Sequence, residues 1–167
     1  MKKVITLQNG SCLNAKQFIH YFERKVFYTL RKYKLLQSKK LEIKELFKLK
    51  KINSITISHE CLDDIAYKAL EAFTKKNAKK ELKKLLPLSF EKNKKVVRPF
   101  YFVSRKELEL YKKLKKIKVK ARKERKRKIE LWLDAMEKKH PEIKNAIVNF
   151  LIRLSSLLNE TKNISLS

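Results

Sequence analysis

The stretch INSITISHECLDDIAYKAL, residues 52–70, changes its pattern in the middle and thereby sets the fold class. Its first part, residues 52–58, is rich in β-branched side chains, which favours a β-strand. From Glu60 onward the pattern predicts a helix that runs to about Lys76. A second β-branched and aromatic stretch, residues 96–103, predicts another strand, which Pro99 restricts to a sheet edge or a strand end. We therefore expect an α+β fold with a small sheet.

Helices are expected in most of the remaining chain, so the fold should be mostly helical. An Asn-Gly turn between Val4–Leu7 and Cys12–Leu13 predicts a short hairpin. Asn14 can then cap a helix to about Leu36. The buried face of that helix is predicted to carry Phe18, Phe22, Val26, Leu30 and Tyr33. Further helices are expected at residues 41–49, at 104–114 behind a Ser104-x-x-Glu107 capping box, at about 121–139 and at about 141–158.

The chain is expected to form a single compact domain over residues 1–158, with residues 159–167 as a tail. Its last helix should be apolar on one face. That face is predicted to carry Ile143, Ile147, Phe150, Leu151, Leu154 and Leu158.

Positive charge is concentrated in one segment. The chain has 44 lysines and arginines against 17 acids, for a net charge of +27, and residues 112–128 hold twelve of the cations with the single acid Glu124. Without acidic partners one turn away, a helix of this composition repels itself. A polyanion would screen it, and we expect RNA bound through backbone phosphates. The predicted RNA-binding residues are Lys112, Lys113, Lys115, Lys116, Lys118, Lys120, Arg122, Lys123, Arg125, Lys126, Arg127 and Lys128, with Arg24, Arg31 and Lys32 on the first helix.

Glycine and cysteine content limit the chemistry. Gly10 is the one glycine, whereas loops that cradle phosphates need several, so neither a Walker loop nor a dinucleotide fingerprint is present. Two cysteines, Cys12 and Cys61, cannot fill a four-cysteine metal site, and we expect no metal and no cofactor. No run of about 18 apolar residues occurs, so we expect no membrane span and a cytoplasmic location.

His59, Asp63 and Asp64 allow two interpretations. They resemble an acid/base or metal cluster at a strand-to-helix junction. They are also explained structurally, because carboxylates in the first turn of a helix interact favourably with its dipole. We favour the structural explanation. His20 and His140 have no nucleophile or metal ligand beside them in sequence and are also interpreted as structural.

Several segments, taken in chain order, resemble one enzyme family. Residues 58–66, SHECLDDIA, resemble a Gly-His-Asn-Leu-Asp-Asp-Glu-Ala segment, and residues 136–144, MEKKHPEIK, resemble a Glu-Glu-Lys-His-Pro-x-x-Lys segment. Both segments belong to the archaeal and eukaryotic-type tRNA 2-thiolation ATP pyrophosphatases, a PP-loop family. Residues 97–100 are similar to its Ile-Lys-Pro-Leu strand, residues 4–12 to the second half of its zinc ribbon, and residues 18–26 and 29–35 to the helix after that ribbon.

The departures from this family are as informative as the matches. The Ser-Gly-Gly-Lys-Asp-Ser loop that binds ATP in the family has no counterpart, and the first ribbon cysteines and the paired catalytic cysteines are missing. The resemblance therefore implies a PP-loop remnant that is not an enzyme and that kept an RNA-facing shell. We expect a lineage-specific archaeal ribosomal protein that binds rRNA beside neighbouring ribosomal proteins. The alternative is a non-catalytic tRNA-binding partner subunit of a tRNA 2-thiolation enzyme, and a DNA-binding chromatin protein is a third interpretation.

Overall fold

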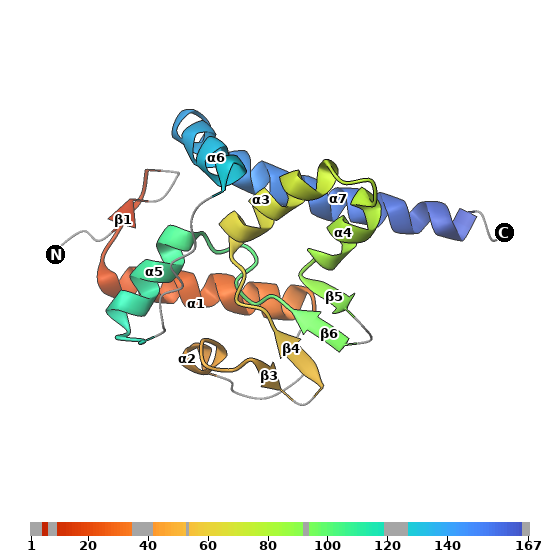
Figure 1. Ribbon diagram of the computed structural model, residues 1–167. Helices are drawn as coiled ribbons and strands as arrows, with labels where there is room; N and C mark the ends of the chain where they lie inside the picture. Colours follow the sequence, from red (N-terminus) through yellow and green to blue (C-terminus); the bar gives the residue numbers. More distant parts are fainter. Residues whose placement is uncertain are drawn as a thin grey trace.

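The computed structural model describes residues 5–6, 10–34, 42–52, 54–91, 94–118 and 127–164, with side chains up to residue 157. The chain folds as a mostly helical α+β protein, as predicted (Figure 1). Its elements are β1 (Ile5–Thr6), β2 (Cys12–Leu13), α1 (Ala15–Lys32), α2 (Ile43–Leu46), β3 (Lys51–Ile52), β4 (Ile55–Ile57), α3 (Leu62–Phe73), α4 (Ala78–Lys84), β5 (Leu88–Glu91), β6 (Lys94–Val97), α5 (Arg105–Leu114), α6 (Lys128–Lys139) and α7 (Ile143–Ile164).

The two stretches predicted as strands lie side by side in a four-stranded sheet of order β3-β4-β6-β5. The first, predicted as one strand over residues 52–58, is divided: Ile52 ends β3 and pairs antiparallel with Ile55, the first residue of β4. β4 and β6 are parallel, with Ile55 opposite Lys95 and Ile57 opposite Val97. A parallel pair needs a long crossover, and α3, α4 and β5 supply it. β6 ends at Val97, before Pro99, and residues 99–102 form a turn where the sequence predicted the strand to continue to residue 103.

The N-terminal part follows its sequence signals closely. β1 pairs antiparallel with β2, and Gly10 at the turn has φ +80°, a left-handed conformation that favours glycine. The side chain of Asn14 accepts a hydrogen bond from the backbone N–H of Gln17, whose own side chain caps Asn14 in return. α1 ends at Lys32, short of the predicted end at Leu36, because Tyr33 and Lys34 form a turn in which Lys34 has a left-handed φ of +47°. Residues 35 and 36 lie outside the described residues.

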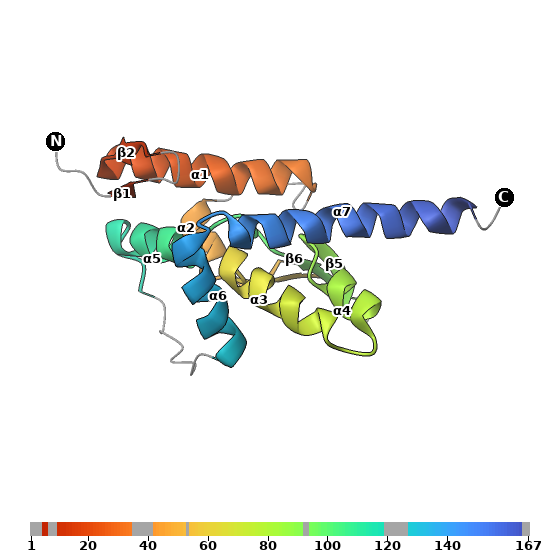
Figure 2. The same ribbon diagram turned by 90° about the horizontal axis from the view of Figure 1, so that it is seen from above.

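The core consists of two apolar clusters. The first joins α1, α2, α5 and the sheet, and in it the Phe22 and Tyr111 rings stack at 4.0 Å. The second joins α3, α4, α6 and α7 around Ile65 and Tyr101. Figure 2 shows α1 and α7 running in the same direction along one side of the molecule. None of the described helices combines the length and the hydropathy needed to cross a membrane.

The C-terminal helices differ from their predicted bounds. α6 begins at Lys128, and residues 119–126, where the basic helix was predicted to start, lie outside the described part of the chain. α7 continues to Ile164, past the predicted end at Leu158. Phe150 is 53% exposed although the sequence placed it on the buried face. Leu151 is buried as predicted, together with Val148 and Lys144, and a cluster of carboxylates accommodates Lys144 inside the molecule.

Two elements were missed in the sequence. Residues 76–87, for which the sequence predicted no element, contain helix α4, and residues 88–91 form the edge strand β5. The lysines of α4 obscured its pattern, since Leu82 and Leu85 are its main buried contacts. β5 pairs antiparallel with β6 and is too short for an alternating pattern to stand out.

Candidate nucleic-acid interface

The predicted basic segment is only partly described. Lys112 and Lys113 end α5, Lys115, Lys116 and Lys118 follow it, and Arg127 and Lys128 open α6. The side chains of Lys113, Lys116, Lys118, Arg127 and Lys128 are exposed. The remaining predicted residues lie outside the described part of the chain: Lys120, Arg122, Lys123, Arg125 and Lys126.

Acids from other elements partner several of these cations. The Nζ of Lys115 lies 3.0 Å from Glu23 of α1, and Arg127 lies 3.0 Å from Glu71 of α3. The sequence indicated no partners because these acids are more than 50 residues away along the chain. Ion pairs at a protein surface contribute at most about 1 kcal/mol, so they leave these cations able to turn to a phosphate.

The outer face of α1 forms a second basic surface. Arg24, Arg31 and Lys32 are exposed on it, and Phe27 and Tyr28 lie between them with 40% and 52% of their surface exposed. The Lys115–Glu23 pair brings the end of α5 beside the turn of α1 that carries Arg24. Arg31 and Lys32 lie about two turns further along the helix. Of the predicted cations on α1, Arg24 therefore lies near the end of α5, whereas Arg31 and Lys32 lie further along the helix.

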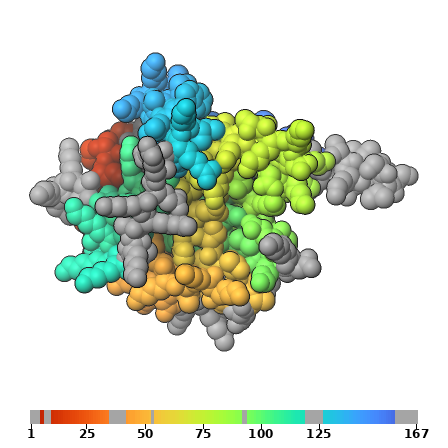
Figure 3. All heavy atoms as spheres, in the orientation of Figure 1, coloured from red at the N-terminus to blue at the C-terminus, as the bar shows by residue number. Residues whose placement is uncertain are grey.

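A third group of lysines was not predicted as a site. Lys76, Lys79, Lys80 and Lys83 surround a surface hollow of about 370 Å³ together with Asn77. These residues connect α3 to α4 and continue along α4, whose atoms form part of the surface in Figure 3. The lysine-rich composition of residues 75–84 was the signal in the sequence, and the helical turns of α4 convert it into a local cluster.

The candidate acid/base residues are held by structural contacts. His59 Nε2 lies 2.7 Å from the Leu46 carbonyl oxygen. An Asp63 oxygen accepts the backbone N–H of Arg105 at 2.6 Å, and an Asp64 oxygen accepts the backbone N–H of Cys61 at 3.0 Å. Asp63 and Asp64 both lie in the first turn of α3. These contacts support the structural interpretation that the sequence favoured.

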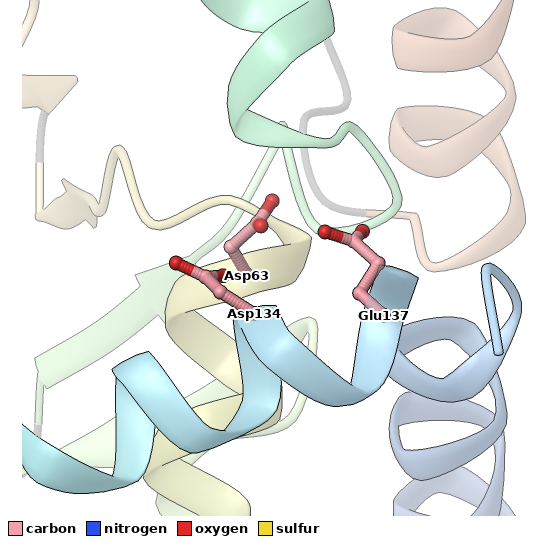
Figure 4. Close-up of side chains that lie close together, drawn as sticks. All are labelled: Asp63, Asp134 and Glu137. Atoms are coloured by element: carbon pink, nitrogen blue, oxygen red, sulfur yellow. The ribbon is translucent and has the colours of Figure 1, made fainter. Parts of the chain in front are cut away.

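A buried lysine joins three carboxylates between α3, α6 and α7. Lys144 is 3% exposed, and its Nζ lies 2.6 Å from Asp63, 2.8 Å from Asp134 and 3.0 Å from Glu137. Burial by itself would lower the pKa of Lys144, but its hydrogen bonds to Asp134 and Asp63 outweigh burial and raise it. Figure 4 shows the three acids converging from α3 and α6.

The same three acids are close enough to hold a metal ion, since one oxygen from each lies within 4.8 Å of the others. The ammonium group of Lys144 already contacts all three. A metal would have to displace this buried cation and leave it without a partner, which is costly. The cluster is therefore explained as an internal ion-pair network.

A second network surrounds Arg98, which is 3% exposed. Its Nε donates to Glu60 at 2.6 Å, and its guanidinium also donates to Ser89 and to the Leu86 carbonyl. Burial alone would raise the pKa of Glu60, but Arg98 and Lys68 outweigh it and lower that pKa to about 2. The network holds the start of α3 against the sheet.

The side chain of Cys61 is buried, like that of Arg98. The residue is 1% exposed, and burial together with Asp64 and Asp63 raises the pKa of its thiol to about 12. The thiolate is the reactive form of cysteine, so Cys61 is unsuited to be a nucleophile near neutral pH.

The networks explain how the charge is distributed. Most of the described carboxylates are partners of a lysine or arginine in the interior or at an element junction. Because 17 acids face 44 lysines and arginines, this pairing leaves a large surplus of cations for the surface. The surplus is the property that a polyanionic partner would use.

Comparisons with known proteins found a likeness to solved structures. No family model and no curated protein matches the sequence. Among solved structures, the chain is similar to the U34-tRNA thiolase NcsA from Methanococcus maripaludis, described with its 4Fe–4S cluster, at a TM-score of 0.47 and 20% identity. The match covers 85% of this chain and 44% of the thiolase chain, so this chain spans less than half the length of that protein.

Proposed function

We propose that this protein is a non-catalytic RNA-binding protein that contacts backbone phosphates. The observation that carries the proposal is the surplus of 44 cations over 17 acids, combined with the pairing of most described acids with a lysine or arginine of the chain itself. Net charge far from zero destabilises a compact chain through self-repulsion, and a polyanion removes that repulsion. The exposed cations of α1, α4 and the end of α5 offer several points of contact.

The proposal excludes a catalytic role. Cys61 is buried with a raised pKa, and His59, Asp63 and Asp64 are engaged in contacts that position α3. The sequence lacks the glycine-rich loop that would hold ATP phosphates. Calorimetric titration with Mg-ATP tests this part, and binding with micromolar affinity would contradict it.

The finer proposal is a fixed position on a ribosomal subunit, bound to rRNA and to neighbouring ribosomal proteins. A basic chain with no apparent catalytic group suits a partner that screens its charge permanently. Quantitative mass spectrometry of native lysate across a sucrose gradient tests it. Near-stoichiometric signal in one subunit peak supports it. Signal confined to the top fractions with an intact thiolation enzyme would favour the tRNA-binding partner subunit instead.

The decisive experiment for RNA binding measures affinity against salt concentration. If about six phosphates are neutralised, the logarithm of affinity should fall with the logarithm of salt at a slope of about −4 to −5. A triple variant Lys113→Gln, Lys116→Gln and Lys118→Gln should flatten this slope. The matched control changes three exposed lysines near β3, Lys48→Gln, Lys50→Gln and Lys51→Gln, with the same loss of charge.

The outcomes separate three cases. A flatter slope in the first variant alone supports contact by the basic segment. Equal flattening in both variants would mean that net charge, and not this segment, determines binding. No measurable RNA binding at low salt would refute the proposed function.

A further inference from the structure

A groove of about 600 Å³ lies between α1 and α7. Both helices run along one side of the molecule (Figure 2). Its lining combines tyrosines, cations and amides: Lys25, Tyr28, Lys32, Tyr33, Phe102, Asn145, Asn149, Ile152 and Arg153. No acid is among these residues, although acids partner cations elsewhere in the described fold. The volume falls within the range of about 300–1,000 Å³ that is typical of sites for small ligands.

One wall of the groove presents an aromatic surface. Tyr28 is 52% exposed, whereas the Tyr33 ring stacks against the Phe102 ring with their centres 6.2 Å apart. The Nζ of Lys32 lies 5.4 Å from the Tyr28 ring centre and 5.6 Å from the Tyr33 ring centre. The ammonium group is thus held at the edge of the groove by two rings.

The opposite wall presents polar groups at regular spacing. Asn145, Asn149 and Arg153 follow one another at four-residue intervals, which places them on one face of α7. Asn149 and Arg153 are exposed. Lys25 is already paired with Glu107 at 2.9 Å, so Lys32 and Arg153 are the cations best placed to meet a ligand.

We propose that this groove binds one unstacked nucleotide of a single-stranded RNA. The base stacks on Tyr28, its phosphate lies between Lys32 and Arg153, and the amide of Asn149 can donate to or accept from the base edge. The inference rests on the proposed RNA binding and adds a preference for unpaired bases. A duplex cannot use the groove, because the faces of its bases are covered by their stacked neighbours.

The combination of ring and cation distinguishes this groove from the hollow beside α4. The hollow around Lys79 and Lys80 has no aromatic residue in its lining, so it can attract phosphates but not hold a base. Trp132 is 52% exposed on α6, but it lines neither hollow. Of these two hollows in the described part of the chain, the groove is the one that joins a stacking ring to cations, which single-strand binding requires.

The test compares two RNAs of equal length by fluorescence anisotropy at one salt concentration. One probe is a single-stranded uridine oligonucleotide and the other is a duplex. Tyr28→Ala should weaken single-strand binding roughly ten-fold, since one stacked base is lost. Duplex affinity should change by less than about two-fold, because it depends on phosphates. Tyr28→Phe keeps the ring and should retain single-strand affinity.

Phe27→Ala is the matched control, since Phe27 is the neighbouring exposed aromatic of α1 and does not line the groove. Thermal melting confirms that each variant is folded. Equal single-strand losses in Tyr28→Ala and Phe27→Ala, or equal losses on both RNAs, would overturn the inference and leave the proposed function standing. Wild-type protein that binds neither RNA would refute the proposed function as well.

Discussion

The Nζ of Lys144 lies 2.6 Å from an Asp63 oxygen, although 81 residues separate them in the chain. The contact joins the first turn of α3 to the first turn of α7, and Asp134 and Glu137 of α6 complete it. Three helices of the second core cluster are thereby joined by one buried cation. The stability of that half of the molecule should depend on it.

Replacing this lysine tests that dependence. Lys144→Met leaves three neighbouring carboxylates without their cation, and breaking a buried ion pair in this way costs about 3–5 kcal/mol. The expected fall in Tm is roughly ten degrees for a chain of this size. Lys139→Met, an exposed change near the start of α7, should alter stability by less than about 0.5 kcal/mol. Similar losses in both variants would contradict a structural role for Lys144.

The same cluster predicts a selective response to divalent cations. Mn²⁺ or Mg²⁺ should leave the Tm of the wild-type protein unchanged, because the Lys144 ammonium contacts all three acids. The Lys144→Met variant should regain part of its lost Tm with Mn²⁺, since oxygen ligands suit that ion and ligand binding stabilises the folded state. Differential scanning calorimetry measures both. A wild-type Tm that rises with Mn²⁺ would show that a metal displaces the lysine.

The lowered pKa of Glu60 predicts that the protein loses stability in acid. Its folded pKa of about 2 lies below its ordinary value of 4.5. Its ionised form therefore stabilises the fold fully above about pH 4.5, and that stabilisation is lost as the pH falls towards 2. Its size is at most roughly 3 kcal/mol.

The measurement is the free energy of unfolding of wild type and Glu60→Gln from neutral to acidic pH. The difference between the two curves should be largest near neutral pH and should shrink below about pH 4.5. Glu45→Gln, which replaces an exposed carboxylate on α2, is the control. Its free energy of unfolding should differ from that of wild type by a similar amount at every pH. A constant difference for Glu60→Gln would exclude the Arg98 network as its cause.

The two cysteines should differ in reactivity. Cys12 is exposed on β2, whereas Cys61 is 1% exposed with a thiol pKa of about 12. A thiol reagent such as Ellman's reagent should titrate one cysteine in the native protein and both after unfolding. Cys12→Ser should abolish the native reaction. A fast native reaction in that variant would mean that Cys61 opens readily to solvent.

The sequence by itself determined the elements whose signals are local. Asn14 and Ser104 cap the helices that they were predicted to cap, because a capping box involves residues only three apart. Parts of the two β-branched stretches became β4 and β6, and the apolar stripe of α1 became part of the first core cluster. Net charge is additive along the chain, so the expectation of a polyanionic partner also needed no structure.

The tertiary structure decided everything that depends on distant partners. In the sequence, Lys144 cannot be distinguished from the many surface lysines. It becomes a buried cation because α3, α6 and α7 converge around it. Glu23 becomes a partner of Lys115 because α5 packs on α1. Tyr28 and Arg153 are 125 residues apart in the sequence and line one groove because α1 and α7 lie together. Local sequence patterns determine which side chains share a face of each helix. Which side chains are buried and which charges pair depends on which helix faces come into contact, and residues far apart in the sequence supply those contacts.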